Sequence, residues 1–350
     1  MRIDKMRHAK GASVMRAGWV GVVALTCVLG AGARPSGQAP AAGVASGVHT
    51  LKVQGNVYMM VGAGGNIALQ ISDDGVLLVD TGTTANADKV VAAVRELTNK
   101  PIRYIINTSA DPDHVGGNDT IGKLGSTIAG GNVGAGAGVG AGIIAHENVL
   151  TRMSAPTGKS APYPTTAWPT DTFVSKQKEL FFNGEAIQTI YKPGHSDADS
   201  IVYFRRSDVI VAGELFNTET YPVIDLAKGG SIKGVLAGLN DMLDIAIPKA
   251  MQEGGTYIIP GRGRLTDEAD LLEYRDMVTI IRDRVQDGVK RGQTLDQVKA
   301  GKPTLDYDAR WGATSGPWTT DMFLEAVYKD LKGAAAPAAA PAAKAPAAKK

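Results

Sequence analysis

A loop rich in carboxylates constrains this chain most strongly. It comes directly after Ile102–Ile106, a short apolar run that predicts a buried strand. The loop carries Asp111, Asp113 and His114, the kinds of donor that a hard or borderline metal ion requires. Two glycines then let the chain turn tightly into a predicted helix at 118–123. The order of strand, ligand-rich loop and helix therefore predicts a metal site.

Three later loops repeat this arrangement. Each places one polar side chain shortly after a predicted strand: His195, then Glu214, then Arg262. Ligands gather at the edge of a sheet where strands end. We therefore expect these side chains to meet the first loop in one site.

The distribution of apolar residues predicts an α/β fold. Predicted strands cover 53–60, 67–71, 76–79, 102–106, 143–145, 186–191, 200–204, 209–212 and 256–259, and predicted helices cover 87–97, 118–123, 147–152, 231–245, 267–289 and 322–331. The strands form two groups, and each group is accompanied by helices. This layout favours two sheets packed together with helices outside, a four-layer αββα sandwich.

The two ends of the chain differ from its body. Residues 1–33 combine a basic front, an apolar stretch too short to span a bilayer and an Ala-x-Ala site ending at Ala33, which predicts a cleavable signal peptide. Residues 34–50 are small and rich in Pro and Gly, typical of a flexible linker, and 333–350 is a tail of Ala and Pro with three lysines. The domain is expected at 51–332, in a secreted or periplasmic protein without a stable membrane span.

Composition excludes several kinds of site. Cys27 is the only cysteine, so after cleavage the chain would have neither disulfides nor thiolate ligands. Loss of residues 1–33 removes five basic and one acidic side chain, which takes the net charge from +2 to −2. A slightly acidic body without a basic cluster argues against nucleic acid as a partner. The glycine-rich stretch 130–142 lacks phosphate-loop spacing and is expected to be a surface loop.

The ordered loops resemble those of the metallo-β-lactamase superfamily. That family has a metal loop Thr-His-x-His-x-Asp-His-x-Gly-Gly, followed by Pro-Gly-His-Ser/Thr, Gly-Asp and Pro-Gly-His-Gly. The matching segments here are Thr108–Gly117, Pro193–Ser196, Gly213-Glu214 and Pro260–Gly263, together with Asp80–Gly82 and Val223–Asp225. The resemblance implies the αββα fold and a metal-dependent hydrolase.

The chain departs from the family pattern at four ligand positions. Ser109 and Asp111 stand where the family has its first two histidines, Glu214 replaces the bridging aspartate and Arg262 replaces the last histidine. The first zinc site therefore keeps one histidine of three. The resemblance implies a reduced, mononuclear site rather than a dinuclear one.

Two outcomes follow from these departures. In the first, one divalent metal ion, Zn²⁺ or the harder Fe²⁺ or Mn²⁺, is bound by Asp111, Asp113, His114, His195 and Glu214. Asp111 or Asp113 would then act as general base. In the second outcome there is no metal, because Arg262 supplies the positive charge through its planar fork.

The other motif residues have supporting roles in either case. Asp80 is expected to orient a ligand, and Ser109 is expected among the residues that support the ligands. Ser109 is not expected to be a nucleophile, because no nucleophile-elbow motif surrounds it. The leading hypothesis is a hydrolase for a small-molecule substrate, either an ester, a lactone, a thioester or an amide. The alternative is a catalytically inactive, metal-free binding protein.

Overall fold

The computed structural model describes residues 47–126 and 140–335. The predicted signal peptide, most of the predicted linker, and most of the glycine-rich stretch and of the tail lie outside these ranges. Within them, no helix combines the length and the apolar character that crossing a membrane requires.

The first sheet has seven strands in chain order, β1 to β7. Neighbours from β1 to β4 are antiparallel, and neighbours from β4 to β7 are parallel. The strands are β1 (His49–Gln54), β2 (Val57–Val61), β3 (Ile67–Ser72), β4 (Gly75–Val79), β5 (Ile102–Ile106), β6 (Gly142–His146) and β7 (Asp171–Phe173).

The second sheet has six strands in the order β13-β12-β11-β10-β9-β8. Only β11 and β12 run parallel; the other neighbours are antiparallel. The strands are β8 (Gln177–Phe182), β9 (Glu185–Tyr191), β10 (Ser200–Phe204), β11 (Val209–Val211), β12 (Tyr257–Ile259) and β13 (Thr266–Asp267).

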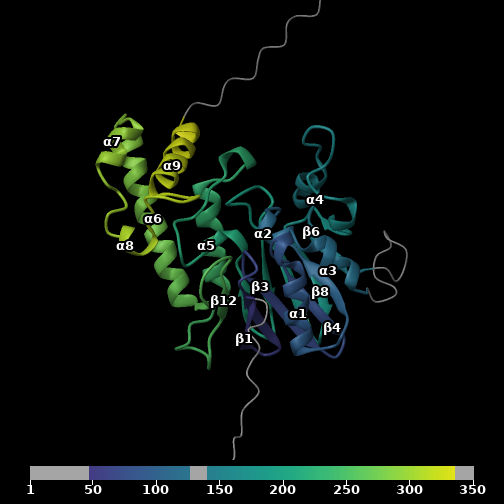
Figure 1. Ribbon diagram of the computed structural model, residues 1–350. Coiled ribbons are helices and arrows are strands. Elements are labelled where there is room, and N and C mark those ends of the chain that lie inside the picture. Colours follow the sequence, from purple (N-terminus) through teal and green to yellow (C-terminus); the bar gives the residue numbers. More distant parts are fainter. Residues whose placement is uncertain (1–46, 127–139, 336–350) are drawn as a thin grey trace, which may run out of the picture. The chain divides into compact units, whose positions relative to one another are not determined.

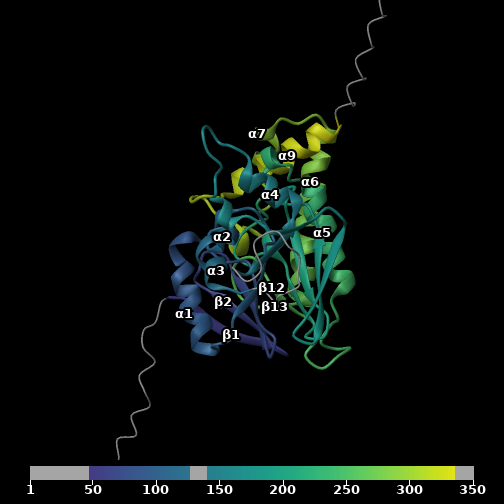
Figure 2. The same cartoon turned by 90° about the vertical axis from the view of Figure 1, so that its right-hand side faces the viewer.

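Helices cover the outer face of each sheet. Apolar side chains of α1 and α3 pack on the first sheet, and those of α5, α6 and α9 pack on the second (Figures 1 and 2). Valine, isoleucine and phenylalanine side chains from both sheets fill the layer between them. The predicted αββα sandwich is confirmed. The helices are α1 (Ala87–Leu97), α2 (Pro112–Val115), α3 (Asn118–Leu124), α4 (Glu147–Ser154), α5 (Ile232–Ile245), α6 (Glu268–Lys290), α7 (Leu295–Ala300), α8 (Asp308–Trp311) and α9 (Thr320–Ala335).

Several element boundaries differ from those predicted. The strand expected at 53–60 is two strands, because Gly55 adopts φ 55° and reverses the chain between β1 and β2. The strand β1 begins at His49, inside the predicted linker, and α9 continues to Ala335, past the predicted end of the domain. An alanine-rich segment favours helix as readily as a tail, so its composition could not place this boundary.

The two sheets are joined where their strands end. The amide of Ser200, at the start of β10, donates to the carbonyl of Thr108, just after β5, at 2.8 Å. The amide of Asn66 donates to the carbonyl of Gly261, just after β12, at 2.8 Å. These bonds bring the ligand-rich loop of the first sheet beside the loops that follow β11 and β12.

Candidate metal centre

His114 is held from behind by Asp80. The imidazole lies in the short helix α2 and is fully buried, with Nδ1 2.8 Å from Oδ2 of Asp80. Asp80 directly follows β4 in the left-handed conformation, φ 66°, and also accepts hydrogen bonds from the amide and hydroxyl of Thr108 at 2.8 and 2.6 Å. A carboxylate on one ring nitrogen fixes the direction of the other. The contact that the predicted orienting role of Asp80 requires is therefore present, and the role itself stays a prediction.

The opposite ring nitrogen of His114 faces two carboxylates. Nε2 lies 2.6 Å from Oε1 of Glu214, in the turn after β11, and 3.9 Å from Oδ2 of Asp113. One donor atom from each of these three residues lies within 4.8 Å of the other two. The neighbouring residues Asp113 and His114 therefore meet Glu214, which lies 100 residues further along the chain, at one point.

Proton affinities in this cluster are strongly shifted. Burial disfavours the charged form of His114, but Asp80 and Glu214 outweigh it and hold the pKa of the imidazole well above 6.5. Burial likewise disfavours the ionised form of Glu214, but contact with His114 lowers the pKa of the carboxyl to about 2. The imidazole of His114 therefore holds a proton opposite the ionised Glu214, and a bound cation would take the place of that proton.

Arg262 lies at the edge of this cluster. Its guanidinium forms an ion pair with Asp113, and Nη1 donates to the carbonyl of Gly64 at 3.2 Å. The arginine side chain is 42% exposed, whereas that of Asp113 is 15% exposed. Arg262 therefore neutralises one carboxylate of the cluster from the solvent side.

Asp111 and His195 form a separate pair with Lys228. Nε2 of His195 lies 2.7 Å from Oδ2 of Asp111, and Nζ of Lys228 donates to Oδ1 of Asp111 at 2.9 Å. Burial opposes the charged form of Asp111, but the hydrogen bonds from His195 and Lys228 hold the pKa of the carboxyl well below its usual range. Asp111 is thus already paired, and the five predicted ligands fall into two groups.

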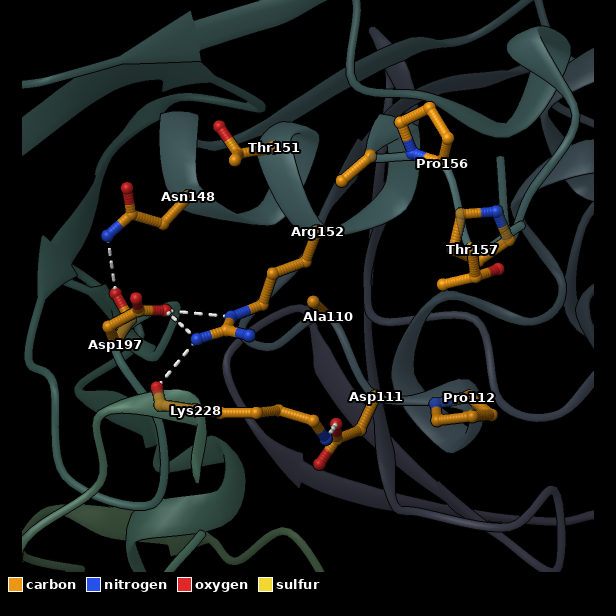
Figure 3. A pocket seen from close by; sticks show the side chains of 12 residues that line it. Ala110, Asp111, Pro112, Asn148, Thr151, Arg152, Pro156, Thr157, Asp197 and Lys228 are labelled. Carbon is orange, nitrogen blue, oxygen red and sulfur yellow. Dashed lines mark hydrogen bonds and ion pairs between the residues drawn. The ribbon is translucent and has the colours of Figure 1, made fainter. Parts of the chain in front are cut away.

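A cavity of about 490 Å³ opens beside this pair. Figure 3 shows Lys228 extending to Asp111, and Arg152 bound between Asp197 and the backbone of Lys228. Charged side chains of both signs line the cavity, together with alanine and proline residues. It borders Asp111 and Lys228, next to the loop that carries the candidate centre.

The loop that carries His195 depends on Asp199. This fully buried carboxylate accepts hydrogen bonds from the amides of Gly194 and Ser196 at 3.2 and 2.6 Å and from the Ser196 hydroxyl at 2.9 Å. Burial raises the pKa of Asp199 to about 6. Sequence reasoning missed Asp199 and Lys228. Asp199 lies four residues past His195 and could have been found there, but no spacing rule indicates Lys228.

Ser109 lies in the loop between β5 and α2. It is fully buried, and its hydroxyl accepts a hydrogen bond from the amide of Asp111 at 3.3 Å. This contact helps to shape the loop that carries Asp111.

Metal-free protein is expected to lose stability between pH 6.5 and 9. Burial lowers the pKa of His195, but the hydrogen bond with Asp111 and the surrounding carboxylates raise it to about 9, from 6.5 in the unfolded chain. The stabilisation is complete below pH 6.5 and is lost as the pH rises through the folded value, at a cost of roughly 3 kcal/mol. Urea unfolding at both pH values, with a chelator present, measures the change. The His195→Asn variant should show a smaller slope, and a flat profile for the parent would contradict the assignment.

The donor set fits a single divalent ion. Two carboxylates and one imidazole are a common ligand set for Zn²⁺, Fe²⁺ or Mn²⁺, and a site with three protein ligands leaves room for water or substrate. The hydrogen bond from His114 to Asp80 is the outer contact that metal-binding histidines usually have. Asp113, His114 and Glu214 would hold the ion.

Comparison with known proteins assigns the chain that carries this centre to a family. A model described as the metallo-beta-lactamase superfamily matches residues 53–262. The chain belongs to the metallo-beta-lactamase superfamily. The match covers β2 to β12, and therefore every loop that contributes to the cluster. It supports a hydrolase-type function and a metal at this position.

Members of the superfamily that resemble this chain include alkylsulfatases. A linear primary-alkylsulfatase from Pseudomonas sp. (strain ATCC 19151) is 23% identical over 259 residues, which are 64% of this chain and 47% of that protein. The structure of a stereoselective inverting sec-alkylsulfatase from Pseudomonas sp. aligns with a TM-score of 0.58 and 17% identity, over 81% of this chain and 50% of the other. This chain spans about half the length of these two relatives.

A metallo-beta-lactamase from Pontibacter korlensis also shares the fold. Its structure aligns with a TM-score of 0.50 and 12% identity, over 66% of this chain and 99% of the other. At such identities the structural likenesses show the fold alone.

Proposed function

We propose that this protein is a hydrolase for small esters that uses one divalent metal ion bound by Asp113, His114 and Glu214. One observation carries the proposal: Asp80 fixes His114 from behind, so that Nε2 points at two carboxylates. A buried cluster of carboxylates is costly without a cation to compensate it. Zinc, iron and manganese all suit the donors, and the choice among them stays open to measurement.

The surrounding residues define what each group can do. A bound ion would lower the pKa of a water molecule and polarise the ester. Asp111 is a weak base because His195 and Lys228 hold its pKa low, so it serves to orient His195. His195 is protonated at neutral pH and can donate its proton to a leaving group. Of the two aspartates predicted as general bases, Asp111 is therefore disfavoured in that role.

Two cations favour an ester that carries a negative charge. The side chains of Arg262 and Lys228 are each at least 40% exposed, and they border the cluster through Asp113 and Asp111. Both can bind an anionic oxygen. Since two alkylsulfatases are among the relatives of this chain, sulfate esters are the first class to test, followed by carboxylic esters and lactones.

The test is hydrolysis measured before and after removal of metal. We expect the protein to hydrolyse an alkyl or aryl sulfate, or a carboxylic ester, and to lose about a hundredfold in rate or more after treatment with a chelator. One equivalent of Zn²⁺, Mn²⁺ or Fe²⁺ should restore the rate. Hydrolysis that is unaffected by metal removal, or no hydrolysis with any of the three ions, would overturn the proposal.

A second candidate function is a metal-free protein that binds an anionic ligand. The ion pair between Arg262 and Asp113 favours it, because a guanidinium already compensates one carboxylate of the cluster. Lys228 compensates Asp111 in the same way. Under this alternative the parent binds no metal, and Arg262→His creates a metal site. Tight metal binding by the parent excludes it.

A further inference from the structure

We propose that a second cavity, next to His195, binds the apolar part of the ester, and this proposal rests on the proposed function. The cavity measures about 380 Å³ and lies between residues 223–226 and the first turns of α9. Ligand pockets of this size are usually apolar with a few polar groups. Its apolar wall consists of Val223, Ile224, Leu226, Trp318, Met322 and Ala326.

His195 lines this cavity and also pairs with Asp111, which lies two residues before Asp113 of the candidate metal centre. Its imidazole contributes to the lining, while Nε2 faces Asp111 at 2.7 Å. On the other side of the ring, Nδ1 donates to the carbonyl of Val223 at 3.0 Å, and the backbone carbonyl of His195 accepts from the amide of Asp225 at 2.9 Å. The segment that forms the wall is therefore bound to His195. When the ester group of a substrate lies beside His195, the alkyl part of that substrate can occupy the cavity.

The two cavities beside the centre differ in charge. The cavity of Figure 3 is lined by Asp111, Arg152, Asp197 and Lys228, and burying an alkyl chain among these groups would cost their hydration. The cavity at α9 is also lined by Asp225, His195 and the ion pair of Glu325 with Lys329 at 2.5 Å, but six of its ten lining residues are apolar. An alkyl chain therefore suits the second cavity rather than the first.

The wall on α9 comes from a part of the chain beyond the family match, which ends at residue 262. A carboxylate oxygen of Asp330 accepts a hydrogen bond from the amide of Ile232 at 2.8 Å, so α9 is fixed to the start of α5. Met322 remains 42% exposed at this wall, although it is a large apolar side chain. Contact with a substrate chain would bury it. The α9 side of the cavity therefore lies outside the residues that the family model matches.

Binding of linear alkanesulfonates tests the proposal directly. These molecules resemble alkyl sulfates but have no ester bond to hydrolyse, so binding can be measured without turnover by titration calorimetry. Between two and eight carbons, and below the concentrations at which micelles form, we expect affinity to rise about threefold to fourfold for each methylene group buried. The variant Met322→Glu should weaken binding of the eight-carbon sulfonate roughly tenfold and leave the two-carbon sulfonate nearly unchanged.

Met322→Glu is suited to this test because a glutamate in the first turn of α9 favours the helix. Met251→Glu is the matched control: Met251 is 81% exposed and does not line this cavity, so the dependence on chain length should be that of the parent. No dependence on chain length in the parent, or the same dependence in Met322→Glu, would overturn the proposal. If affinity depends clearly on chain length but the protein hydrolyses no ester, the cavity binds alkyl chains and the proposed function is wrong.

Discussion

Replacing His114 with alanine is expected to lower the free energy of unfolding of the metal-free protein by about 3 to 5 kcal/mol. The imidazole is fully buried between Asp80 and Glu214, and its loss leaves two carboxylates, almost entirely buried, without their partner. Metal binding and hydrolysis should be lost in the same variant, because the ring supplies the only nitrogen of the cluster.

Urea unfolding of the metal-free parent and of His114→Ala measures the first effect. The matched control is His49→Ala, since His49 is an exposed histidine on β1, where truncation should cost less than about 0.5 kcal/mol. A His114→Ala protein as stable as the His49→Ala protein would show that the buried cluster is not held together by the imidazole.

Replacing Asp80 with asparagine is expected to weaken metal binding and hydrolysis by roughly 10- to 100-fold. Asparagine tolerates the left-handed backbone at this position, and its carbonyl oxygen can still accept the hydrogen bond from the amide of Thr108. What is lost is the negative charge that the Asp80 carboxylate places beside Nδ1 of His114. The loss should therefore appear in metal affinity, measured by competition with a chromogenic chelator, more than in the fold.

Asp208→Asn is the control for this substitution. Asp208 is also a buried aspartate with a positive φ, of 52°, and it accepts hydrogen bonds from Thr256 and Gln252. It precedes β11, whereas Glu214 follows that strand. Asp208→Asn should alter stability but leave metal affinity unchanged. Equal effects of the two variants on metal affinity would mean that Asp80 has no specific role in orienting His114.

The sequence predicts well those residues of the site whose position is fixed by the end of a strand. The carboxyl ends of β4 and β5 lie at one edge because the strands are parallel, so Asp80 and the loop with His114 had to be neighbours. Glu214 and Arg262 follow β11 and β12, which are also parallel. Their presence at the same edge could therefore be predicted from the order of strands and loops along the chain.

Which side chains of the site form ion pairs with one another could not be predicted in the same way. Whether Arg262 contacts Asp113 or Glu214 depends on side-chain rotamers and on the distance between sheets, and neither leaves a periodic pattern in the sequence. Lys228 illustrates the limit most clearly. It reaches Asp111 from a loop 117 residues away in the sequence, and only the packing of residues 223–230 against His195 brings it there.

The metal content of the purified protein tests the central claim most directly. Elemental mass spectrometry should find one equivalent of zinc, iron or manganese per chain, either as purified or after reconstitution and desalting. The variant Glu214→Gln should retain less than about a tenth of that amount, because it removes one of three ligands. An exposed carboxylate, changed in Glu96→Gln, should leave the content unchanged. No transition metal in the parent, or the same content in Glu214→Gln, would contradict a metal centre at Asp113, His114 and Glu214.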